Sequence, residues 1–472
     1  MSQDSSSRNV ANVLRNELNH YSPGEKLPSS RALVERFGVS PVTVSRALAV
    51  LAADGLVVTR PGAGAYRAET VAREKPVVDT SWQEIALTAD GQGGERVVDA
   101  SGLSAGLAVP PPDVVAFNGG YLHASLQPER AMAGALASAA RRPGAWERPP
   151  PAGLTALRAW FARELRLTPA EVVISGGGQA ALSTALRALA SPGSAVLVES
   201  PTYPGVLAAA RAAGLRPVPV PMDDGGVRLD LLREVLAATG AKVFYCQPLV
   251  QNPTGAVLAP ERRRELLEIV HAAGAFLLED DWARHLGHGG PVPAPLVADD
   301  PHGSVVHLGS LTKATSPNLR VAALAARGPV LERLRAIQVV DSFFVPRPFQ
   351  EATLDLVAAP SWPRHLRALA AGLRERRDAM VGALQRELPS LAPPRVPTGG
   401  HYLWLRLPAG TDETALTSAA LRAGVAVSPG RGYFAAEAPA PHLRLGFADT
   451  SGAQEITEGV RRLATACAEV NL

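Results

Sequence analysis

One lysine in the stretch SLTKATSPNLR, residues 310–320, could carry chemistry that is closed to almost every other basic residue of the chain. Of the 47 lysines and arginines, four are lysine: Lys26, Lys75, Lys242 and Lys313. The guanidinium group of arginine stays protonated and is not a nucleophile, whereas the amine of lysine can attack an aldehyde and form a Schiff base. Lys313 is therefore a candidate for covalent chemistry.

A phosphate could be bound by two further features of the sequence. The glycine-rich stretch GGGQAAL, residues 176–182, follows an apolar run and would open a helix. The free N–H groups and the positive dipole end of a helix N-terminus favour an anion. Arg320, shortly after Lys313, adds a permanent positive charge. Each feature is common by itself, so the argument depends on their combination.

Three more polar or aromatic residues each follow a separate apolar run. Tyr203 follows AVLVES and offers a ring that could stack on a planar ligand. Asn252, in QNPTG, could donate to a phenolate oxygen, and Asp280, at the end of FLLED, could keep a pyridine nitrogen protonated. A buried carboxylate is costly unless a cation or donor faces it. A planar, phosphorylated pyridine aldehyde needs all of these functions, and that molecule is pyridoxal 5′-phosphate.

The runs that precede these residues are expected to be strands of one sheet. Apolar segments alternate with helical ones from about residue 116, as in EVVIS (171–175), AVLVES (195–200), KVFYCQP (242–248), FLLED (276–280) and VVHLG (305–309). This alternation predicts an α/β domain with a mainly parallel sheet covered by helices. Ligands bind at the carboxyl ends of such strands, so we expect the residues above to meet there.

Residues 114–472 resemble the class I/II aminotransferases of fold type I, most specifically in QNPTG and in SLTK followed by Leu-Arg. The resemblance implies a large domain with a mainly parallel sheet and a smaller C-terminal α/β subdomain. It makes Lys313 the lysine that binds the cofactor aldehyde. It also makes Arg444, in HLRLGFA, the bidentate partner of a substrate α-carboxylate. The other cofactor contacts that it implies are Gly178, Gln179, Ser310 and Arg320 for the phosphate, Tyr203 for the ring, Asp280 for ring nitrogen N1 and Asn252 for O3′.

Two stretches depart from the family pattern. Trp282 stands two places after Asp280, where the family has a tyrosine whose hydroxyl reaches O3′. An indole N–H can donate but is not a hydroxyl, and we count Trp282 among the cofactor-binding residues. WERPPPAGL, residues 146–154, stands where the family reads Gly-Tyr-Gly-Asp-Pro-x-Gly and offers a tyrosine to a partner subunit. Trp146 or Arg148 would take that place.

The first seventy residues carry a different pattern. Apolar residues recur with helical spacing at Val10, Val13, Leu14 and Leu18. Two further helices are expected over about 31–37 and 41–53, separated by Gly38, with Ser40 as the cap of the second. LVVTRPGAGAYRA then indicates two strands and a glycine-rich turn, which form a wing. Two short helices around a glycine turn are typical of a helix-turn-helix, whose second helix enters the major groove of DNA.

The segment GEKLPSSRALVERFGVSPVTVSRALAVLAADGLV resembles the GntR type of winged helix-turn-helix, which implies double-stranded DNA as a partner. The candidates for DNA contact are Arg31, Thr43, Ser45, Arg46 and the wing glycines Gly62 and Gly64. A glycine lets the backbone approach a phosphate closely. Many members have a basic residue early in the recognition helix, where this chain has Pro41 and Val42.

Composition and charge narrow the class of protein. Hydrophobic residues make up 46% and charged residues 19% of the chain, as in ordinary globular proteins. Without a long apolar run or a secretory signal, we expect no membrane span and a cytoplasmic location. Cys246 and Cys467 indicate neither a disulfide framework nor a zinc site, and no metal is expected. Residues 1–70 hold eight Lys/Arg against six Asp/Glu, too small an excess to indicate DNA binding by itself.

Joined in one chain, the two halves resemble the MocR subfamily of bacterial regulators. The winged helix is expected in residues 1–70, a linker with a short helix near 81–87 in residues 71–113, and the aminotransferase-like domain in residues 114–472. In that subfamily the large domain serves as effector sensor and dimerisation unit rather than as an enzyme. The implied hypothesis is that an amine or amino acid displaces Lys313 from the cofactor, and that a homodimer then changes how it binds its operator. Two alternatives stay open: a working aminotransferase with an accessory DNA-binding domain, and a direct sensor of pyridoxal phosphate.

Overall fold

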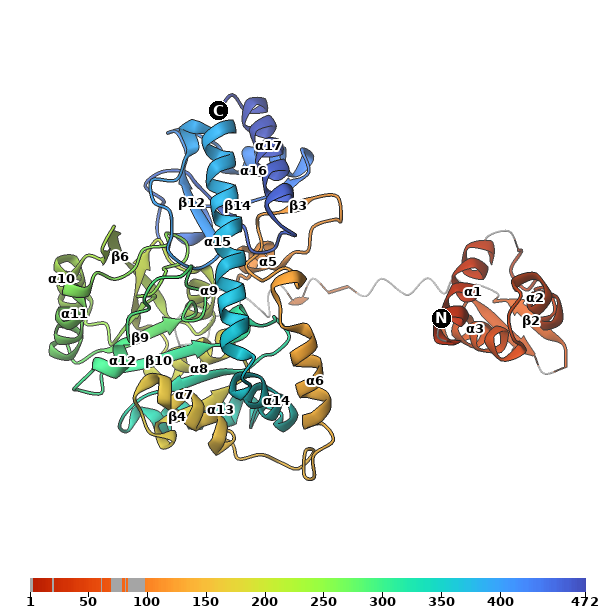
Figure 1. Ribbon diagram of the computed structural model, residues 1–472, viewed down its shortest axis with the longest axis horizontal. Helices are drawn as coiled ribbons and strands as arrows, with labels where there is room; N and C mark the ends of the chain where they lie inside the picture. Colours follow the sequence, from red (N-terminus) through yellow and green to blue (C-terminus); the bar gives the residue numbers. More distant parts are fainter. Residues whose placement is uncertain (1–2, 19–20, 61, 69–78, 81, 84–97) are drawn as a thin grey trace. The chain divides into compact units, whose positions relative to one another are not determined.

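The computed structural model describes residues 3–18, 21–60, 62–68, 79–80, 82–83 and 98–472. The chain divides into two compact units, residues 1–89 and 90–472, each built around its own hydrophobic core (Figure 1). The boundary falls inside the segment expected to be a linker. Most of the short helix expected near residues 81–87 lies outside the described residues.

The smaller unit is a helix-turn-helix followed by a two-stranded wing. Its elements are α1 (Gln3–Glu17), α2 (Ser30–Phe37), α3 (Pro41–Ala53), β1 (Val57–Arg60) and β2 (Gly64–Arg67). At the start of α2 the side chain of Ser29 accepts from the backbone N–H of Ala32. Gly38 ends α2 in the left-handed region, with φ 60°. Ser40 caps α3 by accepting from the N–H of Thr43. The expected helix-turn-helix and wing are confirmed.

Helix α1 packs an apolar stripe against α3. Val10, Leu14 and Leu18 are buried as expected, whereas Val13 is 42% exposed. The buried stripe recurs every four residues, and Val13 lies about 100° around the helix from Leu14. Val13, although it recurs with helical spacing, therefore lies outside the buried stripe.

The larger unit is organised around an eight-stranded sheet in the order β4-β11-β10-β9-β8-β5-β6-β7. Six strands run parallel, while β11 and β7 run against their neighbours. The bounds are β4 (Val172–Ser175), β11 (Ala322–Ala325), β10 (Val305–Ser310), β9 (Phe276–Asp281), β8 (Val243–Cys246), β5 (Ala195–Ser200), β6 (Arg216–Asp223) and β7 (Gly226–Val227). All five strands expected from the sequence are present, so the mainly parallel α/β sheet is confirmed.

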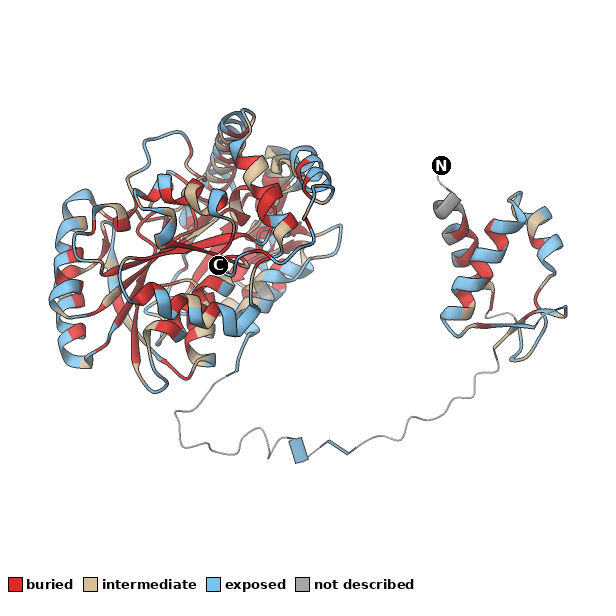
Figure 2. Cartoon of the chain, turned by 90° about the horizontal axis from the view of Figure 1, so that it is seen from below, coloured by how far each residue is buried: buried red, intermediate tan, exposed pale blue. Residues whose placement is uncertain are grey.

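Helices cover both faces of this sheet. Successive strand residues enter different cores, as Leu277 and Leu278 of β9 do. One core is closed by α8 (Gly178–Leu189), α9 (Pro204–Ala212) and α13 (Val330–Ser342). The other receives residues of α7 (Thr155–Leu165), α10 (Leu229–Thr239), α11 (Pro260–Ala272), α12 (Leu296–Asp299) and α14 (Arg347–Ala358), and α6 (Glu129–Ala139) packs on α14. Figure 2 shows the buried strands between helices whose outer faces are exposed.

A smaller C-terminal subdomain is present, as expected. It contains the antiparallel strands β12 (Tyr402–Arg406), β15 (His442–Gly446) and β14 (Ser428–Pro429), with helices α16 (Glu413–Arg422) and α17 (Ala453–Glu469). Strand β13 (Val425–Ala426) pairs in parallel with β3 (Val115–Ala116), which ties an early segment to this subdomain. The long helix α15 (Trp362–Glu387) packs against α17 and runs between the subdomain and the rest of the unit (Figure 1).

Helix α5 (Ser101–Leu107) lies inside the range expected to be linker. It packs against α9 and is part of the larger unit. The glycine, serine and proline content of residues 98–113 suggested a linker, but Leu103 and Leu107 are spaced one helical turn apart and form one side of a short helix.

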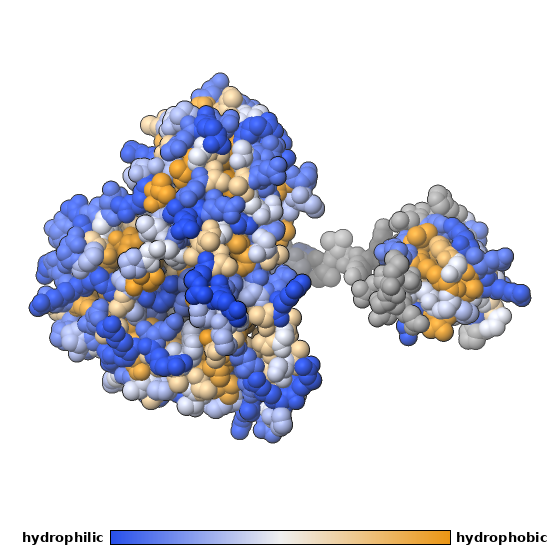
Figure 3. All heavy atoms as spheres, in the orientation of Figure 1, coloured by the Kyte–Doolittle hydropathy of each residue, from blue (hydrophilic) through white to orange (hydrophobic). Residues whose placement is uncertain are grey.

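Across the described residues, none of the helices has the length and apolar character that crossing a bilayer requires. One face of the larger unit is mostly hydrophilic, with apolar residues in small scattered areas (Figure 3).

Candidate cofactor site

A pocket lies at the carboxyl ends of the parallel strands of the larger unit, where the sequence predicted it. It brings together every residue expected to bind the cofactor or the effector carboxylate. Those residues are Gly178, Gln179, Tyr203, Asn252, Asp280, Trp282, Ser310, Lys313, Arg320 and Arg444. Glycine, tyrosine, leucine, glutamine, proline and threonine residues that the sequence did not single out complete the lining.

Lys313 enters the pocket from a short 3₁₀ turn, Thr312–Ala314, that begins two residues after the end of β10. Its Nζ donates to the carbonyl of Gly120 at 2.6 Å and lies 3.9 Å from the ring centroid of Tyr121. Burial lowers the pKa of Lys313 to about 7, and the nearby charge of Arg444 acts in the same direction. A large share of the amine is therefore unprotonated near neutral pH, which is the nucleophilic form.

Asp280 lies near the end of β9 and is buried. Its Oδ2 accepts from the hydroxyl of Tyr245 at 2.6 Å and from Nε2 of Gln247 at 2.8 Å. Burial raises the pKa of Asp280, although these two hydrogen bonds oppose the shift. Both donors are neutral and both reach the same oxygen. Oδ1 is thus able to accept from a protonated ring nitrogen, whose charge would stabilise the carboxylate.

Asn252 and Arg444 are joined across the pocket. Nη1 of Arg444 donates to Oδ1 of Asn252 at 3.4 Å, so the amide nitrogen of Asn252 can donate elsewhere. Nη2 of Arg444 donates to the carbonyl of Asn118 at 2.9 Å, and its Cζ lies 4.0 Å from the ring centroid of Tyr402. Nε of Arg444 is buried and has no hydrogen-bond partner among the described residues. A carboxylate ligand could accept from this unsatisfied donor.

Glycines at the start of α8 form a cradle for an anion. Gly177 has φ 98°, and a Cβ there would lie 2.6 Å from Cζ of Arg320. Arg320 therefore lies directly against the loop, where its Nη2 donates to the carbonyl of Gly176 at 3.1 Å. Ser310 stands close to the first residue of α8, Gly178. A helix N-terminus, a hydroxyl and a guanidinium group at one place suit a phosphate.

The ring of Tyr203 is held in place from two sides. Its hydroxyl donates to Oε1 of Gln179 at 3.1 Å, and Nε2 of Gln179 donates to the carbonyl of Gly205 at 3.1 Å. A Cβ on Gly205 would lie 2.2 Å from the Tyr203 ring, so glycine is required for this close approach. Gln179, which the sequence connected with the phosphate, thus also orients the aromatic ring.

Trp282 lines the pocket, but its indole N–H is engaged elsewhere. Nε1 donates to the carbonyl of Val250 at 3.1 Å. The ring packs edge-on against His401 and close to Tyr402. Trp282 thus contributes an apolar surface to the pocket rather than the donor that the family's tyrosine provides.

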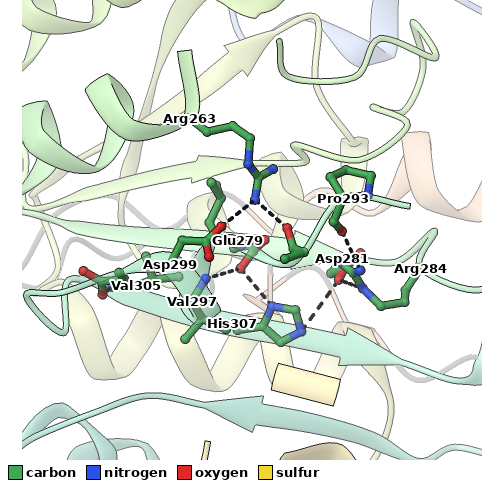
Figure 4. Close-up of polar contacts among 12 residues, drawn as sticks. Arg263, Glu279, Asp281, Arg284, Pro293, Val297, Asp299, Val305 and His307 are labelled. Carbon is green, nitrogen blue, oxygen red and sulfur yellow. Dashed lines mark hydrogen bonds and ion pairs between the residues drawn. The ribbon is translucent and has the colours of Figure 1, made fainter. Parts of the chain in front are cut away.

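The opposite face of β9 and β10 carries a separate ionic cluster (Figure 4). His307 donates through Nδ1 to Glu279 at 2.9 Å, and its Nε2 lies 4.0 Å from Asp281. Arg284 forms an ion pair with Asp281, and the backbone N–H groups of residues 296 and 297 donate to Glu279. Burial raises the pKa of Glu279, but His307 and these N–H groups outweigh it, and the pKa lies below its ordinary value. The cluster pairs its charged groups with one another and with backbone N–H groups of the protein.

The smaller unit presents most of the expected DNA-contacting residues. Arg31, Ser45 and Arg46 are exposed. Gly62 and Gly64 have positive φ values of 75° and 107°, which a wing turn of this shape requires. On the wing, the ring of Tyr66 lies beneath Arg60 and Lys26, with cation-to-centroid distances of 4.7 and 5.9 Å.

Thr43 is not on the exposed face of the recognition helix. It is 6% exposed, and its hydroxyl lies 2.8 Å from the hydroxyl of Ser40. Because Ser40 caps α3, its side chain folds toward the third helical residue, which is Thr43. The expectation that Thr43 faces solvent or DNA was therefore wrong.

Trp146 and Arg148 do not line the pocket of their own chain. Trp146 is 81% exposed, and Arg148 is exposed as well. Both border a surface hollow with Phe349 and Leu136. This placement leaves their expected role toward a second subunit as a prediction.

Sequence reasoning missed several residues of the site. Tyr245 and Gln247 hold Asp280, Gly120 and Tyr121 contact Lys313, and Tyr402 lies beneath Arg444. Tyr245 and Gln247 lie in or next to β8, which pairs with β9, so alternation along that strand could have indicated them. Gly120 and Tyr121 come from a segment without regular structure, and no local signal marks them.

The pocket and its sheet define a pyridoxal-phosphate-binding protein of aminotransferase fold. The residues fit this cofactor: a buried amine, a carboxylate held by neutral donors, an amide donor and an anion cradle lie in one pocket. The family model for aminotransferase class I and II matches residues 118–463, and that for the bacterial regulatory proteins of the gntR family matches residues 6–66. The chain therefore belongs to the aminotransferase class I and II family, with a GntR DNA-binding domain in front, as in the MocR subfamily of regulators.

Relatives of both kinds are similar to this chain. It is 33% identical to the 2-aminoadipate transaminase of Thermus thermophilus over 82% of this chain and 97% of that one. It is 30% identical to the HTH-type transcriptional regulator YdcR of Escherichia coli, over 88% and 89%. Among solved structures, the alpha-aminoadipate aminotransferase LysN of Thermus thermophilus, complexed with N-(5′-phosphopyridoxyl)-L-leucine, has a TM-score of 0.76 at 33% identity, over 83% and 99%.

Proposed function

We propose that this chain is a transcriptional regulator in which pyridoxal phosphate on Lys313 senses an amine or amino acid and alters operator binding by a homodimer. The observation that carries the proposal is the pairing of Lys313 and Arg444 in one pocket of a chain that also has a GntR domain. Lys313 supplies an amine that a ligand amine can replace, and Arg444 supplies a partner for the carboxylate of that ligand. Regulators such as YdcR, and TauR of Rhodobacter capsulatus at 26% identity, share this two-domain arrangement over most of their length.

The residues of the pocket have separate roles toward the cofactor and the effector. When bound, pyridoxal phosphate supplies an aldehyde carbon at which one amine can replace another without oxidation. Asp280 holds a proton on the ring nitrogen, and Asn252 donates to O3′. Arg320, Ser310 and the start of α8 bind the phosphate. Once displaced, the amine of Lys313 would take up the proton that the incoming ammonium group loses, and a pKa of about 7 for the free amine suits it to that exchange.

The homodimer is supported by apolar side chains on the surface of the larger unit. Trp146 is 81% exposed, Phe343 70% and Val340 78%. Exposed aromatic residues of this size are typical of protein interfaces. A second copy covering them would bring two winged helices to one operator, whose half-site spacing then depends on the state of the pockets.

An active aminotransferase is the second candidate function. The identity to the Thermus 2-aminoadipate transaminase and the presence of Lys313, Asp280 and Arg444 favour it. A third candidate, direct sensing of pyridoxal phosphate, needs no amine. Continuous production of a keto acid from an amino donor and acceptor would establish the enzyme. A change in operator affinity on adding cofactor alone would establish the direct sensor.

The deciding experiment compares Lys313→Ala with the wild-type protein in a reporter assay on the DNA that flanks its gene. We expect the variant to lose the absorbance band of the lysine-bound cofactor and the response to effector, while basal DNA binding persists. Lys242→Ala is the control, because Lys242 is exposed and outside the pocket. An unchanged effector response in Lys313→Ala would refute the sensor proposal.

A further inference from the structure

Helix α5 forms one wall of the cofactor pocket. Four of its seven residues line the pocket: Gly102, Leu103, Gly106 and Leu107. The two leucines are one helical turn apart, as are the two glycines, so each pair lies on one side of the helix. A Cβ on Gly102 would lie 3.9 Å from Cβ of Pro204, the first residue of α9, which shows how closely the two helices approach there.

The leucines of this wall are incompletely covered by the protein. Leu107 is 59% exposed, and Leu103 is half-buried. An apolar side chain exposed at the rim of a polar pocket is stabilised when a ligand removes its surface from water. The wall therefore favours a ligand with an apolar part.

The charges of the pocket point to the same kind of ligand. Among the described residues that line it, four are charged: Asp280, Lys313, Arg320 and Arg444. The proposed function assigns each of them, in order, to the ring nitrogen, the aldehyde, the phosphate and one carboxylate. None of the described lining residues of α5 is charged, so a second ionic group on the ligand would have no partner on this side of the pocket, and an uncompensated charge in a desolvated pocket is costly.

We infer that the effector is an α-amino acid with an uncharged, apolar side chain, and that this side chain packs against Leu103 and Leu107 of α5. The inference rests on the proposed function, because it assumes that the effector amine reacts at the cofactor and that Arg444 binds its carboxylate. Helix α5 is then the element that reads the effector side chain. Acidic and sulfonate-bearing amino compounds are disfavoured by the same uncharged wall.

The test titrates the full-length, cofactor-loaded protein with defined amino acids. L-Leucine and L-norleucine are the apolar probes, L-glutamate and L-2-aminoadipate the acidic ones, and taurine the sulfonate. Binding is followed by the absorbance of the bound cofactor and, independently, by calorimetry. We expect the apparent Kd of the apolar probes to be at least about tenfold lower than that of the acidic probes and taurine. Equal or tighter binding of L-glutamate or L-2-aminoadipate would overturn the inference.

Substitutions in α5 test whether this helix causes the preference for apolar amino acids. Leu107→Ala is expected to weaken L-leucine and L-norleucine about tenfold but to leave glycine unchanged, since glycine has no side chain to pack. Leu107→Arg is expected to shift the preference toward L-glutamate. Leu421→Ala is the matched control, because Leu421 is 51% exposed on α16 and does not line the pocket. If Leu107→Ala binds L-leucine as Leu421→Ala does, α5 does not read the side chain.

Failure of the inference can be distinguished from failure of the proposed function. If the protein takes up no cofactor, or if no amino acid changes its spectrum or releases heat, the sensor proposal fails and the inference fails with it. If amino acids do change the spectrum but acidic ones bind best, the sensor proposal stands and the inference alone is wrong.

Discussion

The two faces of strands β9 and β10 carry acids of the same type in very different surroundings. On one face, Asp280 has two neutral partners, Tyr245 and Gln247, and faces the cofactor pocket. On the other face, His307 lies between Glu279 and Asp281, and Arg284 pairs with Asp281 (Figure 4). All three carboxylates are buried and consecutive in sequence. The acid that lacks a cation of its own is the one placed to receive charge from a ligand, whereas the other two have His307 or Arg284 beside them within the protein.

This contrast has a practical consequence for recognising binding sites. The three ligand-capable atoms of Glu279, Asp281 and His307 lie within 4.8 Å of one another, which could suggest a metal site. Arg284 and the backbone N–H groups of residues 296 and 297 already occupy these carboxylates. Oδ1 of Asp281 is buried and lacks a hydrogen-bond partner among the residues that the structure describes, but Arg284 lies on the same carboxylate. We therefore regard this cluster as a stabilising element of the sheet.

Asp280→Asn should have the largest effect and test the pocket face directly. Removing one partner of a buried charge pair costs about 3–5 kcal/mol, so cofactor affinity should fall by two orders of magnitude or more. Without cofactor the same variant should be no less stable than the wild type, because burial raises the pKa of Asp280 and its charged form is unfavourable there. Absorbance titration and urea unfolding measure the two effects. If the variant and the wild type bound the cofactor with equal affinity, Asp280 would not be the acid that receives charge from the ligand.

His307→Ala should show the opposite pattern. It removes the group between Glu279 and Asp281 and should lower the free energy of unfolding by about 3 kcal/mol. Cofactor affinity and the absorbance band should remain within about twofold of the wild type, because His307 does not line the pocket. Urea unfolding of the apo protein and cofactor titration at low temperature separate the two quantities. A large loss of cofactor binding in the folded variant would show that the faces are coupled.

The pH dependence of cofactor capture should report Lys313 alone. With a pKa of about 7, the reactive amine is protonated below neutral pH. The capture rate should fall about tenfold per pH unit below 7 and level off above it. Because the pKa in the unfolded chain is near 10.4, Lys313 also makes the apo protein more stable as pH rises from about 7 to 10. Stopped-flow absorbance measures the rate, and His307→Ala should leave the profile unchanged.

Trp282→Phe should have the smallest effect. It removes the hydrogen bond from Nε1 to the carbonyl of Val250 and should cost about 1 kcal/mol of stability. The absorbance band of the bound cofactor should not move, since this N–H does not reach into the pocket. Thermal unfolding and a spectrum of the loaded variant are sufficient. A shifted band would mean that the indole contacts the cofactor after all.

Local sequence determined much of the architecture. The five expected strands, the cap at Ser40 and the wing glycines all follow from periodicity and backbone preference. The residues after the strands were also found, because a parallel sheet brings strand ends together whatever the details of packing.

The remaining features depend on contacts between distant segments. Tyr245 and Gln247 read as ordinary residues of a buried strand until β8 and β9 pair in register. The sequence of α5 resembled a linker, because the packing on α9 that makes this helix part of the larger unit leaves no local pattern. Thr43 was wrongly expected on the exposed face of α3. Its hydroxyl instead contacts the hydroxyl of Ser40, the residue that caps this helix. In each case tertiary packing or side-chain hydrogen bonding overrode the simple pattern.

The distribution of cations on the winged helix sets the salt sensitivity of operator binding. Arg15 and Arg36 are tied up in ion pairs with Asp54 and Glu17, while Arg60 and Lys26 gather over Tyr66. Each phosphate that a protein neutralises releases condensed counterions and steepens the dependence of log affinity on log salt by about 0.9. Because Arg15 and Arg36 already neutralise carboxylates of their own domain, they should add little to that slope, and operator binding should depend on salt less steeply than the number of basic residues would suggest.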